Sequence, residues 1–279
     1  MKNKNNRSRL PEEDHEEVLE TAGLTSPQIF EVIRLEGVAE LGRPAKSLFW
    51  SGIAAGIALS LSIYCKGFFY GALEGSDLQE VLSNLGYTVG FLIVVLGRLQ
   101  LFTENTITVV LPLLSDLGRE KLTQTARLWG IVFLANMIGS FLSAWVVLNG
   151  NMFPPETTEN FFYLSRELVD LSFKDAFMLA IPAGFIISAM VWLMPTAQSS
   201  GFWVVLLLTY IISLGGMTHV VAGSTEYFLL SLNGELSWTR SLFSGLFPTL
   251  IGNIIGGTGL FALISYGQVK EEIKSEPKD

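Results

Sequence analysis

Apolar residues dominate six stretches of the chain, and polar residues gather between them. Each stretch reaches or exceeds the length of about 20 residues with which an α-helix crosses the hydrocarbon core of a bilayer. The stretches are residues 47–65, 85–114, 127–148, 176–194, 201–231 and 243–266. This pattern predicts an all-α integral membrane protein with six transmembrane helices.

The second and fifth stretches are too long for one straight crossing, and polar residues interrupt both. The second breaks at "LQLFTENT", and the fifth breaks at "GGMTHVVAGSTE", where glycines weaken the helix. Because the breaks take matching places in two groups of three spans, they indicate an inverted repeat, aquaporin-like in its arrangement. Irregular backbone at that depth lines a cavity or is buried in protein. We therefore expect the two breaks to face each other at a binding site near the bilayer midplane.

The composition agrees with a polytopic membrane protein. Hydrophobic residues make up 49% of the chain, charged residues 16%, and the mean hydropathy is +0.44, whereas soluble domains carry about 25% charge. The formal net charge of −8 comes partly from the acidic run "PEEDHEEVLE", and nothing points to nucleic acid. The single cysteine, Cys65, cannot form an intrachain disulfide. The sequence has no P-loop, HExxH pair or cysteine cluster, so we expect no cofactor or metal.

Lysine and arginine set the predicted orientation, since they are enriched in cytoplasmic loops. They are frequent in the N-terminal segment, between spans two and three, and in the C-terminal tail. The opposite side has only Lys66, Arg166, Lys174 and Arg240. Both termini are therefore predicted to be cytoplasmic. The predicted divisions are an N-terminal tail with an amphipathic helix (1–45), a six-helix domain (46–267) and a C-terminal tail (268–279).

Two segments flank the predicted spans. Residues 26–41, "SPQIFEVIRLEGVAEL", open with a serine N-cap and a proline, and their apolar side chains lie near one helical face. We interpret them as a helix along the cytoplasmic membrane surface or under the bundle, with docking on a neighbouring subunit as the alternative. Residues 149–175 are predicted to form a long extracytoplasmic loop with a turn at "FPPE".

The two halves also share a short motif. "ANMIGS" in span three matches "GNIIGG" in span six, which places Asn136 and Asn253 at equivalent points. Small residues of this kind suit close packing of membrane helices. The asparagines either hydrogen-bond to the broken helices or contact the substrate directly.

These motifs carry a resemblance to a known family. "LFTENT" resembles the "LFTST" loop of the formate/nitrite transporter family, and "GGMTHVVA" resembles that family's second loop, with its central histidine at His219. "KDAFMLAIPAGFIISAMVW" and "GNIIGG" are similar to its fourth and sixth spans, so the resemblance covers roughly residues 45–266. It implies a homopentamer in the inner membrane, with one pore in each protomer. The implied substrates are small monovalent anions or their conjugate acids, of the formate, nitrite or hydrosulfide type.

The resemblance also implies a mechanism. An anion would enter a vestibule, pass an apolar constriction and meet a histidine that lends or relays a proton. Bare carboxylates are costly to bury, and neutralisation removes most of that cost. A histidine titrates near neutral pH, and His219 is the only histidine within a predicted span. Its alternative role is that of a hydrogen-bonded core residue.

Five further positions are carried over from the family. Leu101 and Phe102 match apolar constriction residues, and Thr103 matches the loop threonine that faces the histidine. Tyr87 and Phe91 match positions that line the outer and inner narrowings. Without the resemblance, Tyr87 and Phe91 would be interpreted as ordinary core residues.

Several positions depart from the family's pattern. Thr218 stands where an acidic residue usually precedes the histidine, and Gly184 replaces a pore-lining asparagine. Leu168 replaces a vestibule lysine, although Arg166 lies nearby. Three charges are also unusual: Arg98 where the family has glycine, Glu104 where it has a small residue, and Glu226 in the other broken span.

These charges allow three interpretations. Glu104 or Glu226 pairs with Arg98 and holds a broken helix, or Glu104 is neutralised by burial and joins a proton relay. In the third, the pore has changed its substrate to a neutral or cationic solute. The leading predicted function is passage of a small monovalent anion or its conjugate acid. The alternatives are a channel for a neutral small solute and a membrane scaffold or sensor that does not conduct; an enzyme is not expected.

Overall fold

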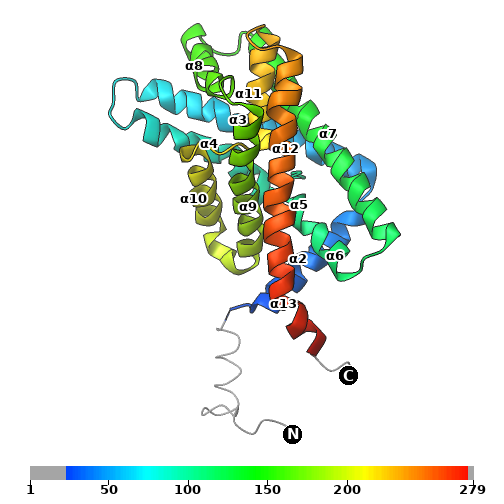
Figure 1. The fold of residues 1–279 in the computed structure, drawn as a ribbon. Coiled ribbons are helices and arrows are strands. Elements are labelled where there is room, and N and C mark those ends of the chain that lie inside the picture. The colour runs from blue at the N-terminus through cyan, green and yellow to red at the C-terminus, as the bar shows by residue number, and fades with distance from the viewer. Residues whose placement is uncertain (1–22, 276–279) are drawn as a thin grey trace.

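The computed structural model describes residues 23–275, and every regular element within them is helical (Figure 1). Five of the described helices are long and apolar enough to cross a membrane, by length and composition. They are α3 (Ala45–Ala72), α4 (Gln79–Leu96), α7 (Arg119–Asn149), α9 (Phe173–Ala197) and the rod Arg240–Ile273. The rod joins η3 (Arg240–Leu246), α12 (Phe247–Ile254), η4 (Ile255–Ala262) and α13 (Leu263–Ser275), with π-helix in η3 and η4.

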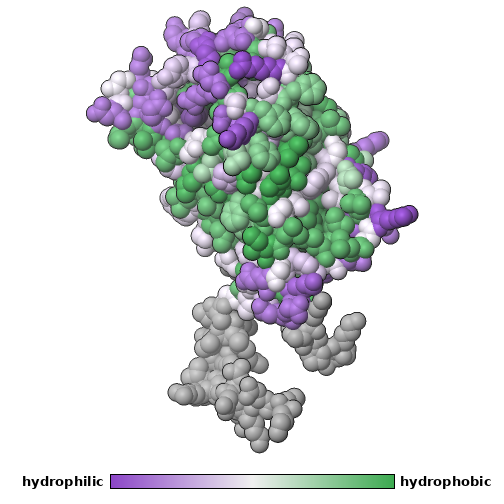
Figure 2. Space-filling model, in the orientation of Figure 1, coloured by the Kyte–Doolittle hydropathy of each residue, from purple (hydrophilic) through white to green (hydrophobic). Residues whose placement is uncertain are grey.

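The two predicted breaks are present. After α4 the chain is irregular until α5 (Asn105–Thr108) and α6 (Val110–Ser115). The fifth predicted span consists of α10 (Gly201–Leu214) and α11 (Val220–Leu232), each too short to cross alone; η2 (Gln198–Ser200) precedes α10. On the face shown in Figure 2, an apolar band lies between two polar ends, as a bilayer-spanning bundle requires.

The bundle consists of two equivalent halves, each with a close helix pair. In the first half, a Cβ on Gly56 of α3 would lie 2.2 Å from the Asn136 carbonyl oxygen of α7. In the second half, a Cβ on Gly184 of α9 would lie 2.2 Å from the Asn253 carbonyl oxygen of α12. No side chain fits at either glycine, so these positions let the backbones approach closely. The predicted pore-facing position Gly184 therefore serves helix packing.

The N-terminal helix α2 (Ser26–Leu41) packs on its own chain. Its buried face, with Ile29, Phe30 and Ile33, contacts α5, α6, α9 and α13. This arrangement agrees with the interpretation of a helix under the bundle. The N-cap is Thr25 and not Ser26: Gln28 Oε1 accepts the Thr25 N–H at 2.8 Å. Of the predicted tail 1–45, residues 1–22 lie outside the described part of the chain.

Helices extend into two of the flanking segments. The predicted loop 149–175 contains a helix, α8 (Pro155–Ser165), followed by the short η1 (Arg166–Leu168). Proline at the start of a helix costs no backbone hydrogen bond, so "FPPE" begins α8 where we predicted a turn. At the C-terminus, α13 continues through the predicted boundary at residue 267 as far as Ser275; residues 276–279 lie outside the described part.

Candidate functional site: two facing helix breaks

Both broken helices end with the same backbone motif. After α4, the N–H of Leu99 donates to Val94 O (2.9 Å) and that of Arg98 to Val95 O (3.1 Å). After α10, Met217 donates to Ile212 O (3.0 Å) and Gly216 to Ser213 O (3.1 Å). This pair of bonds is a Schellman motif, which places one residue in the left-handed region. That residue is Arg98 (φ 52°) in one break and Gly216 (φ 60°) in the other.

Each break is held by one buried asparagine. Asn136 Oδ1 accepts the Phe102 N–H (2.9 Å), and its Nδ2 donates to Gly52 O and Gln100 O (2.8 and 2.9 Å). Asn253 Oδ1 accepts the Val220 N–H (2.8 Å), and its Nδ2 donates to Ala180 O and Thr218 O (2.8 and 3.0 Å). Both amide N–H groups and the amide oxygen of each side chain are therefore committed to backbone. Of the two roles left open for these asparagines, the structure supports the structural one.

Thr103 and His219 join the two breaks at the centre of the bundle. Thr103 Oγ1 lies 2.7 Å from His219 Nε2, and both side chains are buried. His219 is also the N-cap of α11, because its Nδ1 accepts the Ala222 N–H at 3.2 Å. An acceptor nitrogen carries no proton, so this bond assigns the single imidazole proton to Nε2, which donates to Thr103.

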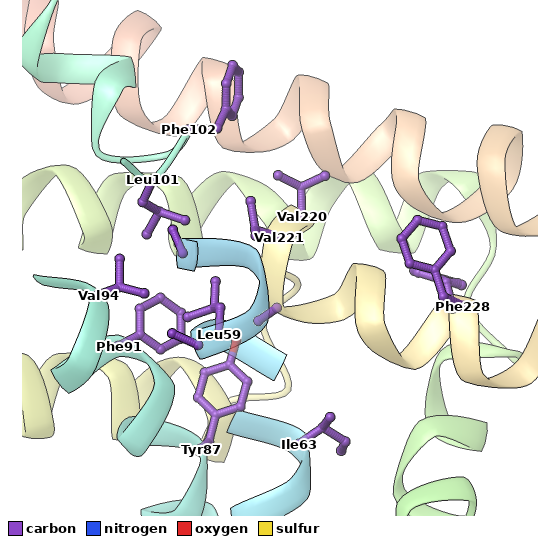
Figure 3. Close-up of a cluster of buried hydrophobic side chains, with 14 of the residues drawn as sticks. Leu59, Ile63, Tyr87, Phe91, Val94, Leu101, Phe102, Val220, Val221 and Phe228 are labelled. Carbon is purple, nitrogen blue, oxygen red and sulfur yellow. The ribbon is translucent and has the colours of Figure 1, made fainter. Parts of the chain in front are cut away.

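Aromatic and aliphatic side chains surround this central pair. The Phe91 ring lies edge-on to the His219 ring with centroids 5.1 Å apart, and Tyr87 contacts Phe91 at 5.3 Å. Leu101 points from the first break toward Phe91, as Figure 3 shows. Phe102 lies on the opposite side of the break, where its ring meets Trp129 and Phe133 of α7 at 5.5 and 5.2 Å. We expected Phe102 to line the constriction. The structure instead places it against α7, away from the Phe91 side of the break.

One cavity opens on each side of the central pair. The α8-side pocket is lined by residues that include Glu167, His219 and Glu226, and it has a volume of about 250 Å³. The α2-side pocket is lined by residues that include Glu36, Leu101 and Glu104, and it has a volume of about 260 Å³. His219 lines only the α8-side pocket, and Leu101 lines only the α2-side pocket. Since α11 lines one pocket and α5 the other, the halves point in opposite directions, as an inverted repeat requires.

Lys66 of α3 lines the α8-side pocket, although it was not among the predicted site residues. Lys66 lines this pocket with Glu167, Leu168 and Glu226. Leu168 takes the predicted vestibule position, and a lysine from another helix contributes to the same cavity. The signal was present, because Lys66 was one of the few cations predicted for that side.

Arg166 does not replace the vestibule lysine. Its guanidinium forms ion pairs with Glu159 (2.7 Å) and Glu235 (2.8 Å), and it is not among the residues that line the pocket. The Arg166 guanidinium holds the pKa of the Glu235 carboxyl below its usual value. Thr218, which stands at the usual acidic position, donates from Oγ1 to Ala176 O (2.8 Å) at the edge of the pocket.

Arg98 does not pair with Glu104 or Glu226, which was one of the three interpretations of these charges. Arg98 Nη2 instead bonds to Glu36 of α2 at 2.9 Å. Glu104 lines the α2-side pocket, and its Oε1 is buried without a hydrogen-bond partner in the described structure. Glu226 lines the α8-side pocket, on the far side of the central pair. Among the residues that the structure describes, no group of three or more His, Cys, Asp or Glu side chains is placed to bind a metal.

Two inverted halves whose broken helices meet between two cavities define a membrane protein of the channel and transporter class. A family model described as "Formate/nitrite transporter" matches residues 27–267. The chain belongs to this family.

A similar E. coli protein supports the assignment, and two solved structures share the fold. The chain is 40% identical to "Inner membrane protein YfdC" of Escherichia coli (strain K12) over 250 residues, covering 90% of this chain and 81% of that protein. It is 27% identical to "Uncharacterized transporter YrhG" of Bacillus subtilis (strain 168), covering 87% and 93%. The fold is similar to that of a "Pentameric formate channel with formate bound" (TM-score 0.70, 19% identity, 81% of this chain and 98% of that chain). It is also similar to an "FNT family ion channel" (TM-score 0.67, 17% identity, 87% and 96%).

Proposed function

We propose that each protomer conducts a small monovalent anion or its conjugate acid, of the formate, nitrite or hydrosulfide type. The observation that carries this proposal is the 2.7 Å contact between Thr103 and His219, where two broken helices meet between two cavities. Family membership supports it, as does the likeness to a channel solved with formate bound.

The chemistry of the centre favours a neutral form of the solute at that point. Phe91 and Leu101 offer no compensation for a bare negative charge, whose transfer into an apolar passage is costly. The His219 Nε2–H satisfies one lone pair of the Thr103 hydroxyl, which leaves the hydroxyl proton for a solute. We infer that the pair gives a passing acid one polar contact in an otherwise apolar constriction lined by Tyr87, Phe91 and Leu101.

The assembly and location belong to the same proposal. The likeness to a pentameric channel supports a homopentamer in lipid, and the name of the E. coli relative supports the inner membrane. The distribution of lysine and arginine supports cytoplasmic termini, which makes the α2-side pocket cytoplasmic and the α8-side pocket extracytoplasmic. The six crossings would be the five long helices plus the α10–α11 pair. A passage of this kind needs no bond-breaking chemistry, so no enzymatic activity is proposed.

One observation favours a second candidate, a channel for a neutral small solute. Each pocket has more carboxylates than cations: Glu36, Glu40 and Glu104 against Arg98, and Glu167 and Glu226 against Lys66. Such pockets repel anions. A neutral solute would not be affected.

Flux into proteoliposomes tests both candidates. Formate, nitrite and hydrosulfide uptake would be measured at two pH values, with shrink–swell permeability to uncharged solutes in parallel. We expect uptake of at least one of these anions. Uptake of none, with permeability to uncharged solutes, would favour the neutral channel; no flux of either kind would leave a scaffold or sensor.

Variants of the central pair provide the control. Thr103→Val and His219→Ala should each lower anion flux, because the first removes the hydroxyl and the second removes the hydrogen bond that orients it. Thr103→Ser keeps the hydroxyl and should retain flux. If Thr103→Val transports as well as Thr103→Ser, the central pair is not part of the pathway.

A further inference from the structure

The two unusual glutamates occupy related places in the two halves. Positions 98 and 216 are the left-handed residues of the two breaks, and the same spacing of 118 relates Glu104 to Ala222 and Thr108 to Glu226. Thr108 lies one helical turn after Glu104, since its N–H donates to Glu104 O at 3.1 Å. Each half therefore has one carboxylate near the start of the short helix that follows its break, Glu104 just before α5 and Glu226 within α11, and the two are displaced by one turn.

Glu104 faces the α2-side pocket. Its charged neighbours there are Glu36 and Glu40 of α2 and Arg98 of the break, and Arg98 is already bound to Glu36. The lining from α9 is uncharged, and so is the whole of η4. Oε1 of Glu104 is buried and has no partner in the described structure. This oxygen is free to accept a hydrogen bond or a proton from a solute in the pocket.

Glu226 faces the α8-side pocket. Its Oε2 lies 3.8 Å from the place where Gly223 would carry a Cβ, on the pocket wall that also includes His219. The charged and titratable side chains around it come from several elements: Lys66 of α3, Glu167 of η1, Tyr87 of α4, Tyr227 of α11, and Arg240 of η3 beside Tyr227. No described cation lies within 4 Å of this carboxylate, as the ion pairs of the described residues show.

His219 is poorly placed to supply protons itself. Both ring nitrogens are engaged, Nε2 with Thr103 and Nδ1 with the Ala222 N–H. A second proton on Nδ1 would displace that N–H and remove the N-cap of α11. A solute that crosses as a neutral acid must therefore exchange its proton with other groups.

We propose that Glu226 and Glu104 are the two proton-exchange groups of the pathway, one in each pocket, on either side of the Thr103–His219 pair. This inference rests on the proposed function. In one pocket the carboxyl O–H of Glu226 gives its proton to the anion, which becomes a neutral acid, and Glu226 becomes a carboxylate. Water in the pocket restores its proton.

The reverse exchange completes the passage. The neutral acid passes Phe91 and Leu101 and gives its proton to the carboxylate of Glu104. Glu104 then releases the proton to water in the α2-side pocket. One proton crosses with each anion, and no co-reactant other than water is needed. Transport in the opposite direction uses the same steps in reverse order.

Transport by Gln variants tests the assignment. Formate uptake into proteoliposomes would be measured for Glu226→Gln and Glu104→Gln, together with the shrink–swell permeability of formamide, an uncharged analogue of formic acid. Removing a positioned proton donor or acceptor should lower formate flux about tenfold or more at neutral pH. Formamide permeability should stay within about twofold, since an amide needs no proton exchange. Retained formamide flux also shows that the variant is folded and open.

A pH profile separates proton exchange from simple shape effects. As the pH outside falls, formic acid forms in solution and no longer needs Glu226. The deficit of Glu226→Gln should therefore shrink at low outer pH, after the leak of protein-free liposomes is subtracted. Glu74→Gln and Glu156→Gln, which alter exposed carboxylates outside both pockets, should change formate flux less than about twofold.

Three results in the variants overturn the inference while leaving the proposed function intact. Unchanged formate flux in both variants shows that the glutamates exchange no proton with the solute. A rise in formate flux shows that they only repel anions. A deficit that persists at low pH, or that extends to formamide, shows a role in pore shape. Wild-type protein that carries none of the anions overturns the proposed function, and the inference with it.

Discussion

The two broken helices share a backbone and differ in their side chains. Both end in a Schellman motif, both are held by an asparagine from a neighbouring helix, and the same hydrogen bonds recur at each. At equivalent places, however, the first break has Arg98, Leu101 and Glu104, whereas the second has Gly216, His219 and Ala222. The shared backbone therefore maintains the fold, and the differences between side chains carry the chemistry of the pathway.

Substitution of the two asparagines should have the largest effect on stability, and it tests the backbone arrangement that the two breaks share. Asn136→Leu and Asn253→Leu each leave one backbone N–H and two backbone carbonyl groups without a hydrogen-bond partner. Each buried group left in this way costs about 1–3 kcal/mol. Both variants should lose most of their folded protein, as measured by size-exclusion profile and thermal stability in detergent. Asn149→Leu, at an exposed position, is the matched control. A tolerated substitution at one site alone would show that the halves are not held alike.

His219 allows cap and transport roles to be separated. His219→Leu places in the second break the type of side chain that the first break has at Leu101, and it removes the N-cap. It should lower the free energy of unfolding by about 1 kcal/mol and lower anion flux as His219→Ala does. His219→Asn supplies another good N-cap, so its thermal stability should stay close to that of wild type. Equal destabilisation by Leu and Asn would contradict the capping role.

Substitutions of the left-handed residues, Arg98 and Gly216, should have smaller effects on thermal stability, and the two effects should differ in sign. A non-glycine residue in this conformation costs about 1–2 kcal/mol, and the exposed Arg98–Glu36 ion pair returns about 0–1 kcal/mol. Arg98→Gly should therefore leave thermal stability unchanged or raise it, whereas Gly216→Ala should lower it by about 1 kcal/mol. A clear loss of stability in Arg98→Gly would mean that the contact with α2 is worth more than this balance.

The smallest expected effect on stability comes from the Arg166–Glu235 ion pair. The pKa of Glu235 is lowered in the folded protein by Arg166, so this pair stabilises the fold above the carboxyl's unfolded pKa. That contribution disappears as the pH falls through the lowered, folded pKa. Glu235→Gln should lower stability by about 0.5 kcal/mol at pH 7, and the difference from wild type should vanish in acid. Thermal melts at several pH values measure it; a pH-independent difference would exclude the ion pair as its cause.

Local sequence signals predicted the positions of the breaks and left two roles open for the asparagines. Glycines and polar residues within apolar stretches marked the breaks near Arg98 and Gly216. The repeated motif placed Asn136 and Asn253 at equivalent points, and in the structure each side chain satisfies the same freed backbone groups in its half. The closeness of Thr103 and His219 came from the resemblance to a family and not from periodicity.

Contacts between distant segments were harder to predict. The partner of Arg98 lies on α2, 62 residues away in the chain, and no local rule relates the two. The direction of Phe102 depends on an irregular loop, where helical periodicity gives no face. Lys66 reaches the α8-side pocket from α3 because of how α3 packs, which hydropathy does not specify.

The position of His219 on one side of the centre has a kinetic consequence. A solute from the α8 side meets the imidazole before the leucine, and a solute from the α2 side meets them in the reverse order. Detailed balance forbids net flux at equilibrium, so this asymmetry cannot change the final distribution across the membrane. It can give the two faces different half-saturation concentrations and different maximal rates, provided that their ratio agrees with the equilibrium. Initial rates measured from each face would therefore show the placement of His219 as a difference in half-saturation concentration between the two directions.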